Sequence, residues 1–140
     1  MVGAALLVRG TAIAQAGLLD ERFFMYSEEL EWQFRLTQNA HSPPPVLYLP
    51  SAVIIHYEGR SSAQVPFVRH YHFQRSRLLL ARLWYGSVFA KLFLTYLVLS
   101  YIWEILIESS KDLLGHRRDL RRQRIAVYAA VVSRLTDTVE

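Results

Sequence analysis

The chain of 140 residues contains no cysteine and few of the residues that break helices, with six glycines and five prolines. The absence of cysteine excludes a small secreted domain held together by disulfides. A hydrophobic content of 52% and a charged content of 20% exclude a disordered chain. The sequence after Met1 lacks the pattern of a secretory signal. These absences leave at most one domain, globular or membrane-associated, which we expect in the cytoplasm, peripheral to the cytoplasmic face of the membrane.

Charge is distributed unevenly along the chain. Residues 1–59 carry three arginines and six acidic residues, a net charge of −3, whereas the remainder carries 13 basic and six acidic residues, a net charge of +7. Basic surfaces favour contact with phosphate on a nucleotide, a lipid headgroup or a nucleic acid. The apolar blocks at 88–99 and 125–132 are unlike a solvated nucleic-acid-binding arm. We therefore expect no nucleic-acid partner, and we expect a membrane surface as one partner.

The first part of the chain has a mixed α/β pattern. Apolar or β-branched runs predict strands at 3–9, 46–49 and 52–56. Thr11 is positioned as the N-cap of a short helix that Gly17 would end. A second helix is expected after Ser27, because its first turn is acidic. From residue 65 onward the pattern is helical.

The segment 87–107 is apolar enough to be considered for membrane association, because its only charges are Lys91 and Glu104. Both flanks are basic, and a single span would send one basic flank to the far side of the membrane. Three alternatives remain open. The segment lies on the membrane surface, forms a soluble packed helix pair, or spans the bilayer.

Adjacent carboxylates of Glu28 and Glu29 begin the second helix, with Glu31 and Arg35 following within two turns. A carboxylate held at a loop-to-helix junction can act as a general base. The alternative is a purely structural role, in which the acids offset the helix dipole and Glu31 pairs with Arg35 at i and i+4.

Histidines and arginines supply the other candidates. His56, at the end of a predicted strand, is either a metal ligand or a hydrogen-bonded surface histidine. His70 and His72 would point to different faces of a helix, which argues against a metal pair. Arginines interleaved with aromatic residues could bind a diphosphate or form a cationic face on a peripheral helix; they are Arg60, Arg69, Arg75, Arg77 and Arg82.

Taken in order, these features resemble the second half of the family 2 glycosyltransferases of GT-A fold, especially the rhamnosyltransferase-like and galactofuranosyltransferase-like branch. The resemblance covers about residues 3–62 well and 63–86 loosely. The matching elements are Gly3-Ala4 with Arg9, Gly17, residues 19–26, Glu28-Glu29, Glu31, Arg35, Tyr48, Pro50, His56, Gly59 and Ser61-Ser62.

The resemblance implies an α/β fold class, the C-terminal part of a GT-A sheet followed by a helical region. It divides the chain into 1–63 of the catalytic domain, a basic and aromatic helix at 64–86, and a helical tail at 87–140. The implied reaction is an inverting transfer of a sugar from a nucleotide-sugar donor to a hydroxyl of a polysaccharide or glycolipid acceptor.

The resemblance also assigns roles to individual residues. Glu29 would be the general base and Glu28 its neighbour, although relatives usually carry aspartate at Glu29, and the extra methylene displaces the carboxylate by about 1.5 Å. His56 would help to bind a divalent metal, Mn²⁺ or Mg²⁺. Substrate contacts would come from Gly3, Ala4, Glu31, Arg35, Ser61, Arg75 and Arg77.

The sequence contains no Asp-x-Asp metal motif and no strand-helix repeat ahead of Gly3, both of which belong to the nucleotide-binding half of such enzymes. We therefore expect the isolated chain to be inactive in sugar transfer. The alternative function is that of a non-catalytic remnant that binds a membrane surface or another partner.

Overall fold

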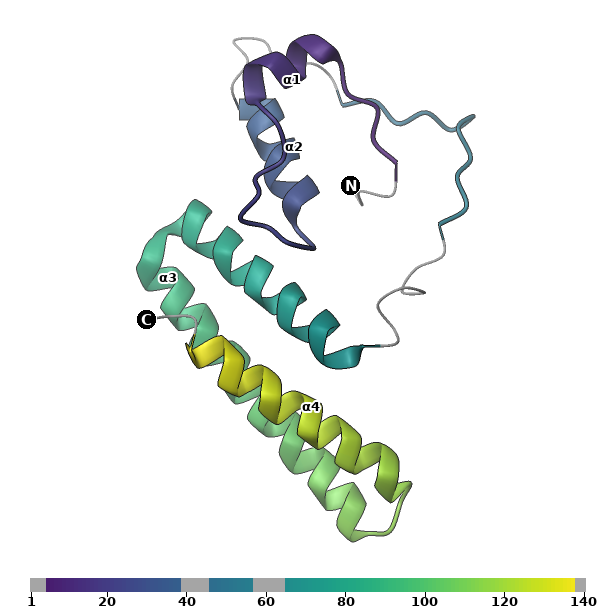
Figure 1. Cartoon of the computed structure of the whole chain (residues 1–140), viewed down its shortest axis with the longest axis vertical. Helices are drawn as coiled ribbons and strands as arrows, with labels where there is room; N and C mark the ends of the chain where they lie inside the picture. The colour runs from purple at the N-terminus through teal and green to yellow at the C-terminus, as the bar shows by residue number, and fades with distance from the viewer. Residues whose placement is uncertain (1–4, 39–45, 57–64, 138–140) are drawn as a thin grey trace.

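The computed structural model describes residues 5–38, 46–56 and 65–137, which form four helices (Figure 1). Helices α1 (Gly10–Ala16) and α2 (Glu28–Gln38) lie together at one end of the molecule. Helix α3 (Pro66–Leu113) is long and sharply bent, and α4 (Arg118–Asp137) runs back along its second half. The molecule is thus a helical hairpin with a small helical unit above it.

The expected α/β fold class, the C-terminal part of a GT-A sheet, is wrong, because the described residues contain helices and no strand. The segments 5–9 and 46–56 adopt no regular structure, apart from a turn in which the amide of Ala52 donates to the carbonyl of Leu49 at 3.1 Å. A strand needs the backbone of a neighbour to satisfy its hydrogen bonds. No described segment pairs with 46–56, and apolar side chains such as Val53 are 83% exposed.

The two short helices follow local sequence signals in part. Gly17 ends α1 as predicted, with a φ of 79° that glycine adopts without strain. The N-cap predicted at Thr11 is wrong, because α1 begins at Gly10 and Arg9 occupies the cap position. Helix α2 begins directly after Ser27, as predicted, and the amide of Glu31 donates to the carbonyl of Ser27 at 3.0 Å.

Helix α3 is interrupted once, at Gly86, where φ is 84° and ψ is 173°. This backbone conformation is almost confined to glycine. It divides α3 into a first half, 66–85, and a second half, 87–113, which diverge from the bend (Figure 1). The helical character predicted from residue 65 onward is confirmed through Asp137. The division into three regions stays a prediction.

The main core lies between α4 and α3. It contains the buried side chains of Tyr101, Val131 and Leu135. Glu108, whose side chain is 3% exposed, is buried beside this core and bonds the Arg121 guanidinium at 2.7 Å. Burial alone would raise the pKa of Glu108, but the hydrogen bond and charge of Arg121, together with the charge of Lys111, lower it. The hairpin is therefore closed by apolar packing and by the buried Glu108 carboxylate, which pairs with Arg124 of α4 at 3.3 Å as well as with Arg121.

Candidate functional site

The acidic pair lies at the positive end of α2. Glu28 and Glu29 are its first two residues, and both are half-buried. The Oε2 atom of Glu28 is buried and has no hydrogen-bond partner among the described residues. The Glu29 carboxylate forms no ion pair with another described residue. Carboxylate oxygens without a partner can accept a proton or a hydrogen bond from a ligand.

The segment before the acidic pair has an unusual backbone. Tyr26 and Ser27 both have positive φ, at 67° and 66°, although neither is glycine. Consecutive left-handed residues cost free energy and often occur at functional sites. The Tyr26 ring packs edge-on against Phe73 at 5.6 Å, and Ser76 donates to the carbonyl of Met25 at 2.7 Å. Helix α3 thus holds the turn that presents the two carboxylates.

Arg35 and Glu31 join α2 to the end of α1. Arg35 Nε lies 2.7 Å from Glu31 Oε1, which confirms the predicted pairing at i and i+4. The two terminal nitrogens of Arg35 donate to the carbonyls of Ala16 and Leu18. The Glu31 residue is only 6% exposed. Both side chains are engaged within the fold, and their predicted contact with substrate stays a prediction.

Arg75 and Arg77 lie on the first half of α3 and are half-buried. The Arg77 guanidinium lies over two aromatic rings, 5.5 Å from the centre of Phe73 and 5.0 Å from that of Phe93. It also donates to Gln74 Oε1 at 3.0 Å. Arg77 makes no ion pair with a described acidic residue, so its charge is available to an anionic ligand.

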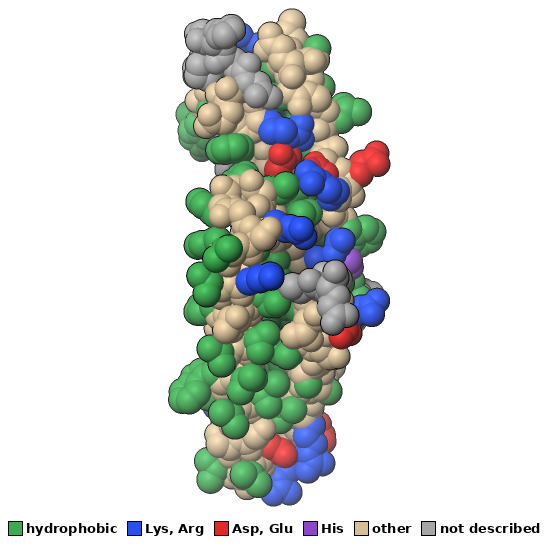
Figure 2. Space-filling view, turned by 90° about the vertical axis from the view of Figure 1, so that its left-hand side faces the viewer, with side chains coloured by type: hydrophobic (Ala, Val, Ile, Leu, Met, Phe, Trp, Pro, Cys, Tyr) green, Lys and Arg blue, Asp and Glu red, His purple; other side chains and the backbone are tan. Residues whose placement is uncertain are grey.

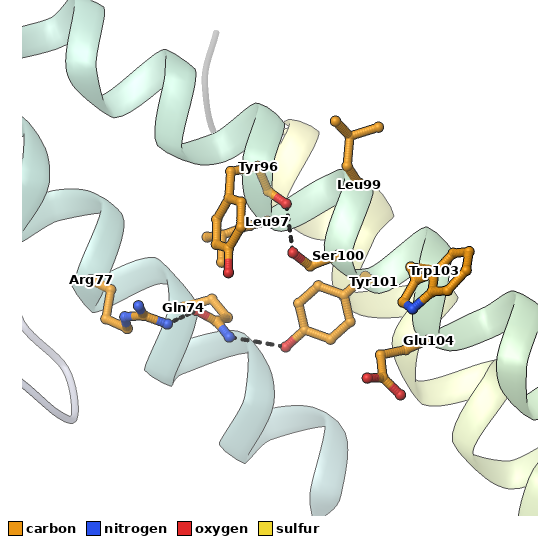
Figure 3. Close-up of a pocket in the computed structure, with 9 residues that line it drawn as sticks. All are labelled: Gln74, Arg77, Tyr96, Leu97, Leu99, Ser100, Tyr101, Trp103 and Glu104. Atoms are coloured by element: carbon orange, nitrogen blue, oxygen red, sulfur yellow. Dashed lines mark hydrogen bonds between the residues drawn. The ribbon is translucent and has the colours of Figure 1, made fainter.

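Arg77 lines a groove of about 600 Å³ between the two halves of α3. Figure 3 shows this groove, with Arg77 and Glu104 at opposite sides of the view. Its lining residues are Gln74, Arg77, Tyr96, Leu97, Leu99, Ser100, Tyr101, Trp103 and Glu104. Reasoning from the sequence did not find this groove, because the bend at Gly86 brings residues more than twenty positions apart together.

The two α3 histidines face different neighbours, as predicted. His70 Nδ1 lies 3.2 Å from the Tyr101 hydroxyl, and burial lowers its pKa, with a further contribution from the charge of Arg69. His72 lies against the ring of Phe24 at 4.6 Å, and burial likewise lowers its pKa. The pair does not form a joint metal site.

His56 is exposed and lies at the end of a described segment. No group of three or more His, Asp or Glu side chains within 5–38, 46–56 and 65–137 could hold a metal ion. The described residues alone therefore do not fit a Mn²⁺ or Mg²⁺ site, and the role of His56 stays a prediction. The candidate substrate contacts Gly3, Ala4 and Ser61 lie outside the described residues.

Helix α3 is long and apolar enough to cross a membrane. Its most apolar window of 18 residues has a mean hydropathy of 1.6, and only 11% of that window is buried. On the face of the molecule in Figure 2, apolar side chains gather along one edge and over the lower part. A single helix of this composition is weak evidence for a span, and an exposed apolar face also suits a helix lying on the membrane surface.

Part of the chain is similar to a known glycosyltransferase. An N-acetylglucosaminyl-diphospho-decaprenol L-rhamnosyltransferase of Mycobacterium tuberculosis, from strains CDC 1551 / Oshkosh and ATCC 25618 / H37Rv, is 38% identical over 64 residues. The alignment covers 46% of this chain and 20% of the relative's length. No model of a known protein family matches the chain, and no solved structure matches it. The likeness supports a glycosyltransferase-like character for the matched segment.

Proposed function

We propose that this chain is the acceptor-side portion of an inverting glycosyltransferase, which transfers a sugar from a nucleotide-sugar donor to a hydroxyl of a glycolipid or polysaccharide. The 64-residue similarity to the mycobacterial rhamnosyltransferase carries the proposal. The relative's name specifies L-rhamnose as the transferred sugar and a diphospho-decaprenol lipid as the acceptor. We extend to this chain the class of acceptor, a sugar linked through diphosphate to a polyprenol.

In this proposal Glu29 accepts the proton of the attacking hydroxyl, and Glu28 assists as its neighbour. The support is their place at the N-terminus of α2, where the helix dipole favours negative charge. The buried, unpartnered Oε2 of Glu28 is a second support. Arg75 and Arg77 are the proposed contacts for phosphate. His56 is proposed as one ligand of a divalent metal whose other ligands lie outside the described residues.

The proposal places the protein on the cytoplasmic face of the membrane, with the exposed apolar surface of α3 in contact with lipid. Support comes from the low burial of the most apolar window of α3. The +7 charge of residues 60–140 would add attraction to anionic headgroups. A nucleic-acid partner is not part of the proposal.

The test joins this chain to the nucleotide-binding portion of the mycobacterial relative and measures L-rhamnose transfer to a polyprenyl-diphosphate-linked N-acetylglucosamine. Replacing Glu29 by Gln should lower kcat by about 10²–10⁴-fold, because general-base catalysis is removed. Glu21→Gln is the matched control, since Glu21 is exposed and lies before α2. Full activity of the Glu29→Gln variant would remove Glu29 from the mechanism.

A non-catalytic role at the membrane surface is the second candidate, favoured by the same exposed apolar surface of α3. Under this alternative the chimeric enzyme transfers no sugar. The chain alone binds anionic vesicles in a salt-dependent manner, and it binds no nucleotide sugar with or without Mn²⁺. Measurable transfer by the chimera would exclude it.

A further inference from the structure

The second half of α3 carries an exposed row of large apolar side chains. They recur at intervals of three and four residues, so they lie along one helix face. The row, here called the apolar stripe, consists of Phe89, Leu92, Tyr96, Leu99, Trp103 and Leu106, which are between 45% and 66% exposed. At a rise of 1.5 Å per residue the stripe is about 26 Å long. Large exposed apolar patches mark sites that bind another protein, a membrane or a ligand.

The apolar stripe runs along one wall of the groove between the halves of α3. Tyr96, Leu99 and Trp103 belong to both (Figure 3). A ligand seated in the groove could therefore continue from these shared side chains along the rest of the stripe. This continuity points to a molecule with a polar head and a long apolar chain.

Polar groups in the groove indicate what the head contains. Arg77 presents a guanidinium that its contacts with Phe73, Phe93 and Gln74 hold in place. A guanidinium held in one position loses little entropy when it binds phosphate oxygens in a bidentate manner. Charge complementarity therefore favours an anionic phosphate or diphosphate at this side of the groove.

The other side of the groove suits a sugar. Glu104 is exposed there, makes no ion pair with a described residue, and can accept hydrogen bonds from sugar hydroxyls. The neighbouring Trp103 ring is 63% exposed and offers an apolar face against which a sugar ring can pack. A carboxylate at this position would repel a second phosphate, so the groove distinguishes its two sides by charge.

We infer that the groove and the apolar stripe together hold a polyprenyl-diphosphate-linked sugar, with the diphosphate at Arg77, the sugar toward Glu104 and the prenyl chain along the stripe. This inference rests on the proposed function, because it assigns a binding site to the proposed acceptor. It adds that, within the membrane contact proposed for α3, the second half of the helix recognises one particular lipid.

The test measures binding of the 140-residue chain to three kinds of vesicle, in the absence of any nucleotide sugar. The first contains phosphatidylcholine alone. The second contains phosphatidylcholine with phosphatidylglycerol. The third contains phosphatidylcholine with polyprenyl-diphosphate-linked N-acetylglucosamine, in the amount that gives the same total charge as the second. We expect the third to bind at least about tenfold more tightly than the second, because its headgroup offers the groove a diphosphate and a sugar together, whereas phosphatidylglycerol offers a single phosphate and no sugar. Equal affinity for the two anionic vesicles would overturn the inference.

Two variants locate the binding. Arg77→Gln should abolish the preference for the diphosphate lipid, whereas Arg82→Gln, on the same half of α3 but outside the groove, should preserve it. Trp103→Ala, which removes an exposed ring and leaves the core intact, should weaken binding of the diphosphate lipid severalfold. Its control is Leu113→Ala, an 83% exposed residue beyond the stripe. Helical circular dichroism checks that each variant remains folded.

The outcomes separate this inference from the proposed function. An unchanged preference in both groove variants overturns the inference even if the chimeric enzyme transfers sugar through Glu29. A preference that Arg77→Gln abolishes and Trp103→Ala weakens supports the groove even if Glu29→Gln keeps full activity. If instead the stripe is covered by a second copy of the chain, Trp103→Ala converts a dimer to a monomer in light scattering and leaves lipid preference unchanged, which also overturns the inference.

Discussion

The two ends of this molecule are stabilised in different ways. The hairpin of α3 and α4 is closed by buried apolar side chains, among them Val131 at 0% and Leu135 at 1% exposure. The unit of α1 and α2 has little apolar core of its own. Arg35, Glu31 and backbone carbonyls join its helices, and Phe23 and Ala16 are its buried apolar residues.

This difference separates the hairpin, which packs around its own core, from the unit that presents the proposed general base. The hairpin brings together helices that are close in sequence, which makes its packing entropically inexpensive. The acidic pair lies in the weakly packed unit, on a turn with two positive φ angles. The following predictions test how independent the two ends are.

The largest loss of stability is expected from the hairpin core. Leu135→Ala removes a fully buried side chain and should lower the free energy of unfolding by about 2–5 kcal/mol. Urea unfolding followed by circular dichroism measures this change. Leu114→Ala, at an 84% exposed position, is the control and should shift the free energy by less than about 0.5 kcal/mol. Equal effects of the two substitutions would show that the hairpin is not the stable core.

The next largest loss of stability is expected at the bend of α3. Gly86→Ala should cost about 1–3 kcal/mol, because alanine is strained at a φ of 84° although open space surrounds its Cβ. We also expect the halves of α3 to separate, which a distance measurement between spin labels on each half would detect. Gly10→Ala is the control, since Gly10 is helical and an added Cβ meets nothing within 4 Å. A stabilising effect at Gly86 would contradict the strained bend.

Local signals in the sequence predicted the helices better than the fold. Gly17 as a helix stop and the acidic start of α2 depend on neighbouring residues, and both are found where expected. The apolar or β-branched runs at 46–49 and 52–56 carry strand propensity, but propensity forms a strand only beside a second strand. The described residues supply no such neighbour.

The contacts of the candidate site were likewise predictable where they join neighbouring residues, and not where they join distant ones. The pairing of Glu31 with Arg35 follows from helical spacing and was predictable. The bonds from Arg35 to Ala16 and Leu18 join residues 17 to 19 positions apart, and no local pattern indicates them. The groove depends on the bend at Gly86. A glycine in a helical pattern indicates a weak point, but not the direction in which the helix turns.

Arg35 links α2 to the end of α1, and one substitution removes this link without changing the hairpin core. Arg35→Met leaves the buried Glu31 carboxylate without its partner and should cost about 1–3 kcal/mol. Hydrogen exchange should accelerate in α1 while the amides of α4 remain protected, since the hairpin does not depend on this pair. Arg22→Gln, at an exposed ion pair, is the control and should leave exchange unchanged. Faster exchange in α4 would indicate that the two ends unfold together.

The smallest effect concerns pH. The pKa of His70 is lowered in the fold, chiefly by burial, so the neutral form is the one that the folded state favours. The stability that His70 contributes is present above its ordinary pKa of 6.5 and is lost as the pH falls through the lower folded value. The lowered pKa of Glu108 acts in the same direction at more acidic pH, because the folded state favours its charged form and loses that stability on protonation. Melting temperatures measured from pH 7.5 down to about pH 2 should therefore fall in two stages. His72, whose pKa burial also lowers, contributes to the first stage. His70→Gln should therefore reduce the first stage, the double variant His70→Gln/His72→Gln should remove it, and Glu108→Gln should reduce the second. A pH dependence that none of these variants alters would assign it to other groups.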